Sequence, residues 1–206
     1  TNPVAVGDRV EFHADGDLLP DGSVPASETA PAAITRILPR RNYIIRKSVN
    51  LSRQAHIIAA NVDHAFIVVT LAFPEVKLPF IDRLLVTCEV YGVKPVIVLN
   101  KIDIVDEFRD DFAPALENFH RIYEGAGYSI LEVSAKTGRG VDELRRLCLE
   151  KSEDGAPGIS LFSGVSGVGK SSLIKAMDPS LNPKTGLISE AHLQGRHTTT
   201  FYEMYP

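Results

Sequence analysis

The segment from Gly164 to Ser171 constrains the fold of this chain most strongly, because it reads G-x-x-x-x-G-K-S. An apolar run, Ile159–Phe162, precedes it, and a helical pattern follows it. Its glycines let successive backbone N–H groups curl inward toward an anion, and the following helix adds its positive end. The segment therefore predicts a phosphate-binding loop between a strand and a helix, and with it an α/β domain.

Individual side chains of this loop have distinct expected roles. Lys170 would place its charge on the β- and γ-phosphates and act in catalysis, and the Ser171 hydroxyl would be a ligand of Mg²⁺. The remaining loop residues would cradle the phosphates mainly through their backbone. The predicted phosphate-binding residues are Gly164, Val165, Ser166, Gly167, Val168, Gly169, Lys170, Ser171 and Ser172.

Three further apolar runs, at 64–71, 95–99 and 129–133, resemble strands buried on both faces of a parallel sheet. Helical patterns lie between the runs, with apolar residues at three- and four-residue spacing. This alternation predicts a doubly wound, mostly parallel α/β domain. Ligands bind at the carboxyl ends of the strands in such a fold, so the loops there are the candidate site.

The loop after the run 95–99 reads Asn100-Lys101-Ile102-Asp103. Guanine presents two N–H donors on its Watson–Crick edge, and one carboxylate can accept both, so we expect Asp103 to read the base. Asn100 would hold the neighbouring loop and approach N7, and the stem of Lys101 would cover the flat face of the base. Adenine would leave the buried carboxylate unpaired, which costs several kcal/mol.

The loop after the run 129–133 reads Ser134-Ala135-Lys136. We expect the Ala135 backbone N–H to donate to guanine O6, Ser134 to brace the loop and Lys136 to lie along the base. This is the third strand-end loop of one sheet with suitable chemistry. Together the three loops predict a guanine-nucleotide site that binds GTP and GDP with Mg²⁺.

The order of these motifs is unusual, because both base-reading loops precede the phosphate loop. A parallel sheet keeps its site at one edge however its strands are joined, so the order predicts a circularly permuted GTPase. Downstream, Gly195–Thr200 reads GRHTTT. We expect Thr199 to reach Mg²⁺ and the γ-phosphate, with Thr198 and Thr200 as alternatives, and His197 to orient the attacking water or to be a plain surface residue.

Residues 1–48 differ from the rest and predict part of a small β-barrel, OB-like in type, before a GTPase domain at 49–206. The first 28 residues carry six acidic residues, whereas none occurs from Thr29 to Val62. Positive charge of this kind attracts a phosphate backbone, so we expect Arg40, Arg41, Arg46 and Lys47 to contact RNA. The alternative is that these residues only balance acidic neighbours.

The remaining composition indicates a reduced, cytoplasmic protein. Cys88 and Cys148 lie in apolar helical patterns, which favours buried, unreactive thiols. No apolar run approaches the roughly 18 residues of a membrane span. We expect a monomer without a membrane partner. The chain begins without Met and stops in an apolar stretch at Pro206, so we expect it to be incomplete.

The chain resembles the circularly permuted GTPases of bacterial small-subunit ribosome assembly, the RsgA (YjeQ) family. The resemblance rests on the Asn100–Asp103 motif after Pro-Val-Ile-Val-Leu, Ser134–Lys136, the loop GVSGVGKSS and GRHTTT. It covers residues 60–206 well. It implies an amino-terminal OB barrel, binding to the small ribosomal subunit and its rRNA, and ribosome-stimulated hydrolysis of GTP to GDP and phosphate.

Two features of that family are missing from the sequence. The D-x-P-G loop would fall just beyond Pro206, and no Cys and His cluster has zinc spacing, so zinc is expected only in a carboxyl-terminal domain outside this chain. Three alternatives stay open: an ATP-using phosphotransferase, a nucleotide-regulated RNA-binding module without turnover, and a permuted GTPase of large-subunit assembly.

Overall fold

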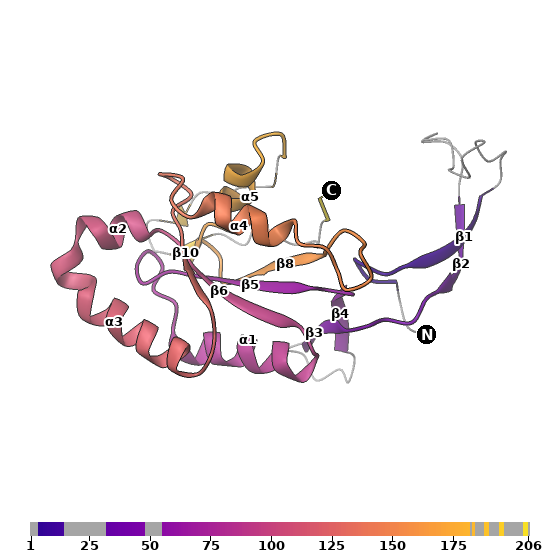
Figure 1. Cartoon of the computed structure of the whole chain (residues 1–206), viewed down its shortest axis with the longest axis horizontal. Coiled ribbons are helices and arrows are strands. Elements are labelled where there is room, and N and C mark those ends of the chain that lie inside the picture. Colours follow the sequence, from indigo (N-terminus) through magenta and orange to yellow (C-terminus); the bar gives the residue numbers. More distant parts are fainter. Residues whose placement is uncertain are drawn as a thin grey trace. The chain divides into compact units, whose positions relative to one another are not determined.

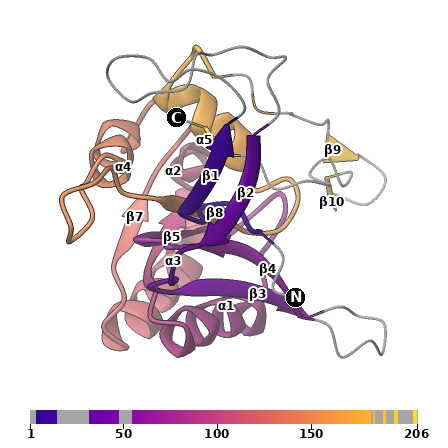
Figure 2. The ribbon, with the colours of Figure 1, turned by 90° about the vertical axis from the view of Figure 1, so that its right-hand side faces the viewer.

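The computed structural model describes residues 4–14, 32–47, 55–181, 183, 188–189, 194–195 and 204–205. The chain divides into two compact units, Thr1–Asn61 and Val62–Pro206. Figures 1 and 2 show their elements from two directions.

The first unit contains two antiparallel strand pairs. β1 (Val10–Ala14) pairs with β2 (Ala32–Ile37), and β3 (Tyr43–Lys47) pairs with β4 (Ala55–Ala60), each pair with one irregularity of register. The short, partly alternating segments 10–12 and 34–38 predict strands in the sequence, which β1 and β2 confirm, whereas β3 and β4 were not predicted. The unit ends at Asn61, later than the predicted boundary at 48, because β4 pairs with β3. An OB-like barrel stays a prediction.

A buried ion pair fixes the amino-terminal segment of this unit. Arg40 donates from Nε to Asp8 Oδ1 at 2.6 Å and from a terminal nitrogen to Oδ2 at 2.7 Å. Only 8% and 1% of the two side chains are exposed. The Arg40 guanidinium lowers the pKa of Asp8 through this hydrogen bond, and the Asp8 carboxylate in turn raises the pKa of Arg40. The expectation that Arg40 contacts RNA is therefore corrected, because Asp8 neutralises the charge of Arg40.

The second unit is built on a parallel four-stranded sheet in the order β7-β6-β5-β8. Its strands are β5 (His64–Val69), β6 (Lys94–Leu99), β7 (Ile130–Glu132) and β8 (Ser160–Ser163). All six residues of β5 are buried, as expected for the central position of an apolar run. The four predicted strands and their parallel arrangement are therefore confirmed.

Helices cover both faces of this sheet, which makes the domain doubly wound (Figure 1). Helices α1 and α3 lie on one face, and α4 and α5 lie on the other. The predicted apolar stripes provide the buried contacts, for example Ile81 in α1 and Leu144 in α4. The helices are α1 (Leu78–Val90), α2 (Ile102–Glu107), α3 (Arg109–Gly125), α4 (Val141–Cys148) and α5 (Lys170–Met177).

Both cysteines are free thiols; Cys88 is buried, as expected from the sequence, whereas Cys148 is half-buried. Burial raises the pKa of Cys88 and of Cys148 to about 11, so both are protonated near neutral pH. Among the described residues, none of the helices combines the length and apolar character required for a membrane span. Two short paired strands, β9 (Ile188–Ser189) and β10 (Gln194–Gly195), complete the described elements.

Candidate nucleotide-binding site

The three motif loops follow the carboxyl ends of three strands of one sheet. The loop 164–169 joins β8 to α5, the segment around Asn100 joins β6 to α2, and the segment around Ser134 follows β7. Because all strands are parallel, these loops emerge at the same edge of the sheet. β6 and β7 are neighbours, so the two base-reading loops lie next to each other.

Glycine is required at two positions of the phosphate loop. Gly164 has φ 153°, and a Cβ there would lie 2.3 Å from the Val68 carbonyl oxygen. Gly169 has φ 95°, and a Cβ there would lie 2.4 Å from Asn100 Nδ2. Both contacts are far shorter than real carbon contacts, and both φ values disfavour other residues. The sequence motif thus reflects close backbone packing at this site.

Lys170 is the first residue of α5, and its ammonium lies inside the loop that precedes it. Nζ donates to the carbonyl oxygens of Gly164 and Val165, each at 2.9 Å. Burial lowers the pKa of Lys170. The two carbonyl contacts hold the charge beside the curled backbone, where an anion would bind. Ser171 follows Lys170 at the amino end of the same helix.

Asn100 connects all three loops, although it carries no charge. Its Nδ2 donates to the Val168 carbonyl oxygen at 2.8 Å, and its Oδ1 accepts the Ala135 N–H at 3.3 Å. Its own N–H donates to Val69 O at 2.8 Å, and the residue is 2% exposed. The expectation that Asn100 holds a neighbouring loop is confirmed, since one side-chain amide binds the phosphate loop and the second base-reading loop.

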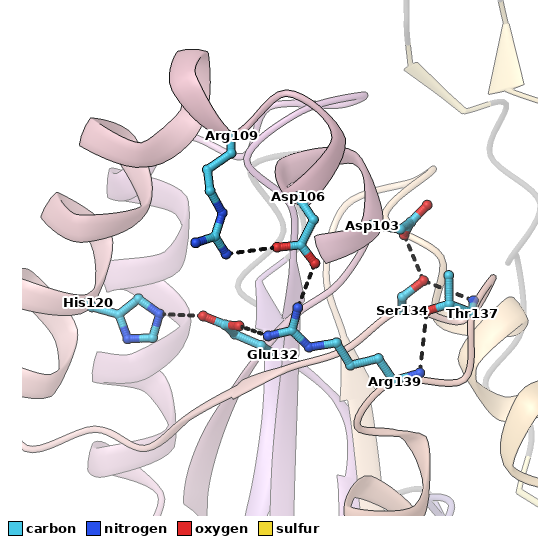
Figure 3. A network of polar contacts seen from close by, with 8 residues as sticks. All are labelled: Asp103, Asp106, Arg109, His120, Glu132, Ser134, Thr137 and Arg139. Atoms are coloured by element: carbon cyan, nitrogen blue, oxygen red, sulfur yellow. Dashed lines mark hydrogen bonds and ion pairs between the residues drawn. The ribbon is translucent and has the colours of Figure 1, made fainter.

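Asp103 is oriented by Ser134. The Ser134 hydroxyl donates to Asp103 Oδ1 at 2.7 Å and accepts the Thr137 N–H at 3.1 Å (Figure 3). Lys136 Nζ lies 3.8 Å from Asp103 Oδ2. Because Ser134 is fully buried, its proton has a fixed partner, and one carboxylate oxygen is held while the carboxylate stays partly exposed. The bracing role expected of Ser134 is confirmed.

Lys101 occupies the turn between Asn100 and α2 in a left-handed conformation, with φ 63°. Its ammonium donates to the carbonyl oxygen of Phe73, in the loop after β5. Burial lowers the pKa of Lys101, although Asp103 acts in the opposite direction. Its stem is therefore partly packed rather than free in solvent. Ile102, the next residue, is buried in the core.

Several predicted residues cannot be located in this site. His197 and Thr199, with Thr198 and Thr200, lie outside the described residues. Arg46 and Lys47 belong to β3, but their side chains also lie outside what is described. Within the described residues, no group of three or more His, Cys, Asp or Glu side chains could hold a metal ion.

Sequence reasoning missed the polar residues that support the base-reading loops. Arg139 lies between Asp106 of α2 and Glu132 of β7, and Glu132 also contacts His120 of α3 (Figure 3). No local pattern marks these residues, because they lie on separate segments of the chain. Only the juxtaposition of α2, α3 and β7 brings them together.

The profile of the RsgA GTPase family matches residues 37–206 of this chain. The chain belongs to the RsgA GTPase family. It is 45% identical over 205 residues to the small ribosomal subunit biogenesis GTPase RsgA of Flavobacterium johnsoniae, covering 100% of this chain and 57% of the relative. The RsgA of Bacteroides fragilis is 45% identical over 206 residues, covering 100% of this chain and 59% of that protein.

Two solved structures are also similar to this chain. YjeQ from Thermotoga maritima has a TM-score of 0.63 and 33% identity, covering 94% of this chain and 59% of YjeQ. YloQ, described as a circularly permuted GTPase, has a TM-score of 0.53 and 25% identity, with coverage of 85% and 50%. The RsgA resemblance and the permuted α/β fold are thereby confirmed. The chain spans less than two thirds of the RsgA relatives it matches.

Proposed function

We propose that this chain binds GTP and GDP and, as part of an RsgA-type protein, hydrolyses GTP with Mg²⁺ during biogenesis of the small ribosomal subunit. The observation that carries the proposal is the amide of Asn100, which binds Val168 of the phosphate loop and Ala135 of the base-reading loop. These two bonds join the loop proposed to bind phosphate to the loop proposed to read the base. The printed names of the relatives support the ribosomal role.

At the base end, guanine would insert beside Asp103, which accepts its N1–H and 2-amino donors. Ser134 already holds one oxygen of this carboxylate at 2.7 Å, so the acceptor is oriented before the base arrives. Ala135 would donate its N–H to guanine O6, and Lys101 and Lys136 would flank the base. An ATP-using enzyme does not need this arrangement, since adenine presents an acceptor where guanine presents a donor.

At the phosphate end, the backbone of residues 164–169 and the ammonium of Lys170 would bind the β- and γ-phosphates. The Ser171 hydroxyl fits Mg²⁺, which takes oxygen ligands and obtains most of them from phosphate and water. The ion supplies neutralisation of charge on the phosphate oxygens when bound. We propose that Thr199 adds a second protein ligand and that His197 orients the attacking water.

Hydrolysis should depend on the partner. The test adds purified small ribosomal subunits to an RsgA protein of the relatives' full length that carries this sequence. We expect the GTP turnover rate to rise at least tenfold, because a bound partner can order the catalytic groups around the nucleotide. Single-turnover phosphate release with and without subunits measures this. Equal stimulation by large subunits would favour the large-subunit alternative, and no turnover under any condition would favour a binding module.

The first unit is proposed to dock on ribosomal RNA through a positive face. Arg41, Arg46 and Lys47 are the proposed phosphate contacts within the acid-free stretch 29–62. Arg41 is exposed and donates to the Asn61 carbonyl oxygen at 3.1 Å. Arg40 is excluded from the set, because Asp8 neutralises it. A monomeric, cytoplasmic protein is part of the same proposal.

Replacing Arg41 and Lys47 together by alanine should reduce the salt dependence of small-subunit binding. Each lost phosphate contact lowers the slope of log affinity against log salt by about one unit. Co-sedimentation across a salt series measures the slope. Arg40→Ala is the matched control: it should lower thermal stability, because it leaves buried Asp8 unpaired, while the slope stays unchanged. An unchanged slope in the double variant would place the RNA-binding face elsewhere.

A further inference from the structure

A network of charged side chains lies next to the two base-reading loops (Figure 3). At its centre, Arg139 donates to Asp106 Oδ2 at 2.6 Å and to Glu132 Oε2 at 2.7 Å. Asp106 lies in α2, three residues after the base-reading Asp103, and Glu132 ends β7, two residues before Ser134. One guanidinium thus bridges the elements that carry the two halves of the base site.

The backbone of Arg139 is bound to the same loop. Its carbonyl oxygen accepts the Ser134 N–H at 2.9 Å, and its N–H donates to Thr137 Oγ1 at 3.4 Å. The turn from Ser134 to Arg139 is therefore closed on itself. Ser134, in turn, donates to Asp103 at 2.7 Å. A shift of Arg139 would therefore move Ser134, and Ser134 would move the Asp103 carboxylate that is proposed to read guanine.

We propose that Arg139 is a positioning residue for guanine recognition, which holds the loop at 134–139 against α2 so that both oxygens of Asp103 meet the base. The proposal rests on the guanine site described under Proposed function and names a determinant outside its motifs. The guanidinium suits this role, since its fixed fork reaches two carboxylates at once. A lysine ammonium is a single point of charge and cannot reproduce the geometry.

The remaining residues of this network contact Arg139 only through Glu132 or Asp106. His120 lies 3.0 Å from Glu132 through Nε2 and 3.0 Å from Glu124 through Nδ1, and Arg109 lies 3.2 Å from Asp106. Burial alone would lower the pKa of His120, but its hydrogen bonds to both glutamates outweigh burial and raise it. These groups keep Glu132 and Asp106 oriented toward Arg139. They do not contact the base-reading loops themselves in any described interaction.

The solvent exposure of Arg139 limits how much nucleotide affinity its removal can cost. The Arg139 side chain is 48% exposed, and such ion pairs are individually weak because water screens them. Two short bonds to one fork, with a closed turn, make a network stronger than either pair. We therefore expect a change in affinity of about threefold to tenfold, rather than the complete loss expected for a group that touches the base.

The test is the affinity of Arg139→Ala for GDP and for IDP, whose hypoxanthine base lacks the 2-amino group. The variant should bind GDP about threefold to tenfold more weakly, and the ratio of GDP to IDP affinity should fall, since a misaligned Asp103 gains less from the 2-amino donor. The affinities for GTP and GDP should fall by the same factor, because Arg139 does not contact the phosphate loop in any described interaction. Arg139→Lys should recover only part of the ratio.

Controls separate the possible outcomes. Arg146→Ala in α4 removes an exposed arginine that also pairs with two glutamates and should leave both affinities unchanged. A general loss of stability in Arg139→Ala would lower the melting temperature with the GDP-to-IDP ratio intact, and that result would overturn the proposal. If Arg139→Ala does not fold, the ratio in Asp106→Asn decides by the same criterion. If the parent itself binds no GDP, the proposed function fails first.

Discussion

Asp103→Asn should weaken GTP binding at least tenfold, with about a hundredfold expected, and should create binding of xanthosine nucleotides. The magnitude follows from the loss of one hydrogen bond to a charged acceptor, which contributes about 1.5–3 kcal/mol. An amide has one acceptor and one donor group, so it cannot accept both donors of guanine. Xanthine carries an oxygen at position 2, which an amide N–H can meet.

The structure determines how the new amide would lie. The Ser134 hydroxyl accepts the Thr137 N–H at 3.1 Å, so its proton is directed to Asp103 Oδ1. An asparagine would keep its oxygen on this proton and turn its NH₂ group toward the base. The NH₂ group of the asparagine would then face the N–H donors of guanine, and no hydrogen bond could form between them. The substitution therefore reverses base preference rather than merely weakening the site.

Equilibrium titration with fluorescent GDP, GTP and xanthosine diphosphate measures this outcome. Asp110→Asn, in the first turn of α3, is the matched control, because it makes the same chemical change at an exposed position. It should leave all three affinities unchanged. Undiminished GTP binding by Asp103→Asn would show that another group reads the base, and the guanine assignment would have to be abandoned.

Lys170→Ala should reduce the affinity for both GTP and GDP by about a hundredfold or more. The ammonium lies between the Gly164 and Val165 carbonyl oxygens, at 2.9 Å from each, and no other described lysine or arginine is in the loop. Its loss removes a charge-assisted bond to phosphate in a partly desolvated site, where such bonds are strongest. It also leaves two inward-facing carbonyls beside the bound anion.

Isothermal titration with each nucleotide, with and without Mg²⁺, measures the effect. Lys175→Ala in the same helix α5 removes an exposed lysine and should change neither affinity. Ser171→Ala should mainly abolish the dependence of GTP binding on Mg²⁺, because its hydroxyl is the proposed ligand. Parent-like affinity in Lys170→Ala, or Mg²⁺-independent binding by the parent, would contradict the assigned roles.

The sequence alone determined the parts of this protein that repeat a local rule. Buried parallel strands need continuous apolar runs, and the runs before Gly164, Asn100 and Ser134 predicted the sheet correctly. Gly164 and Gly169 were also predicted from the sequence, because their backbone angles exclude most other residues and therefore require glycine. The order of the loops predicted a permuted fold, because a parallel sheet gathers strand ends at one edge in any chain order.

Only the tertiary structure decided which polar groups are paired. Arg40 was indistinguishable from Arg41 in the sequence, yet the structure buries Arg40 in an ion pair with Asp8 and leaves Arg41 exposed. β3 and β4 were not predicted, because pairing depends on a partner strand rather than on pattern. Arg139 follows the base-reading motif without belonging to it. Its bonds reach from β7 to α2, and such contacts between distant segments leave no periodic trace in a sequence.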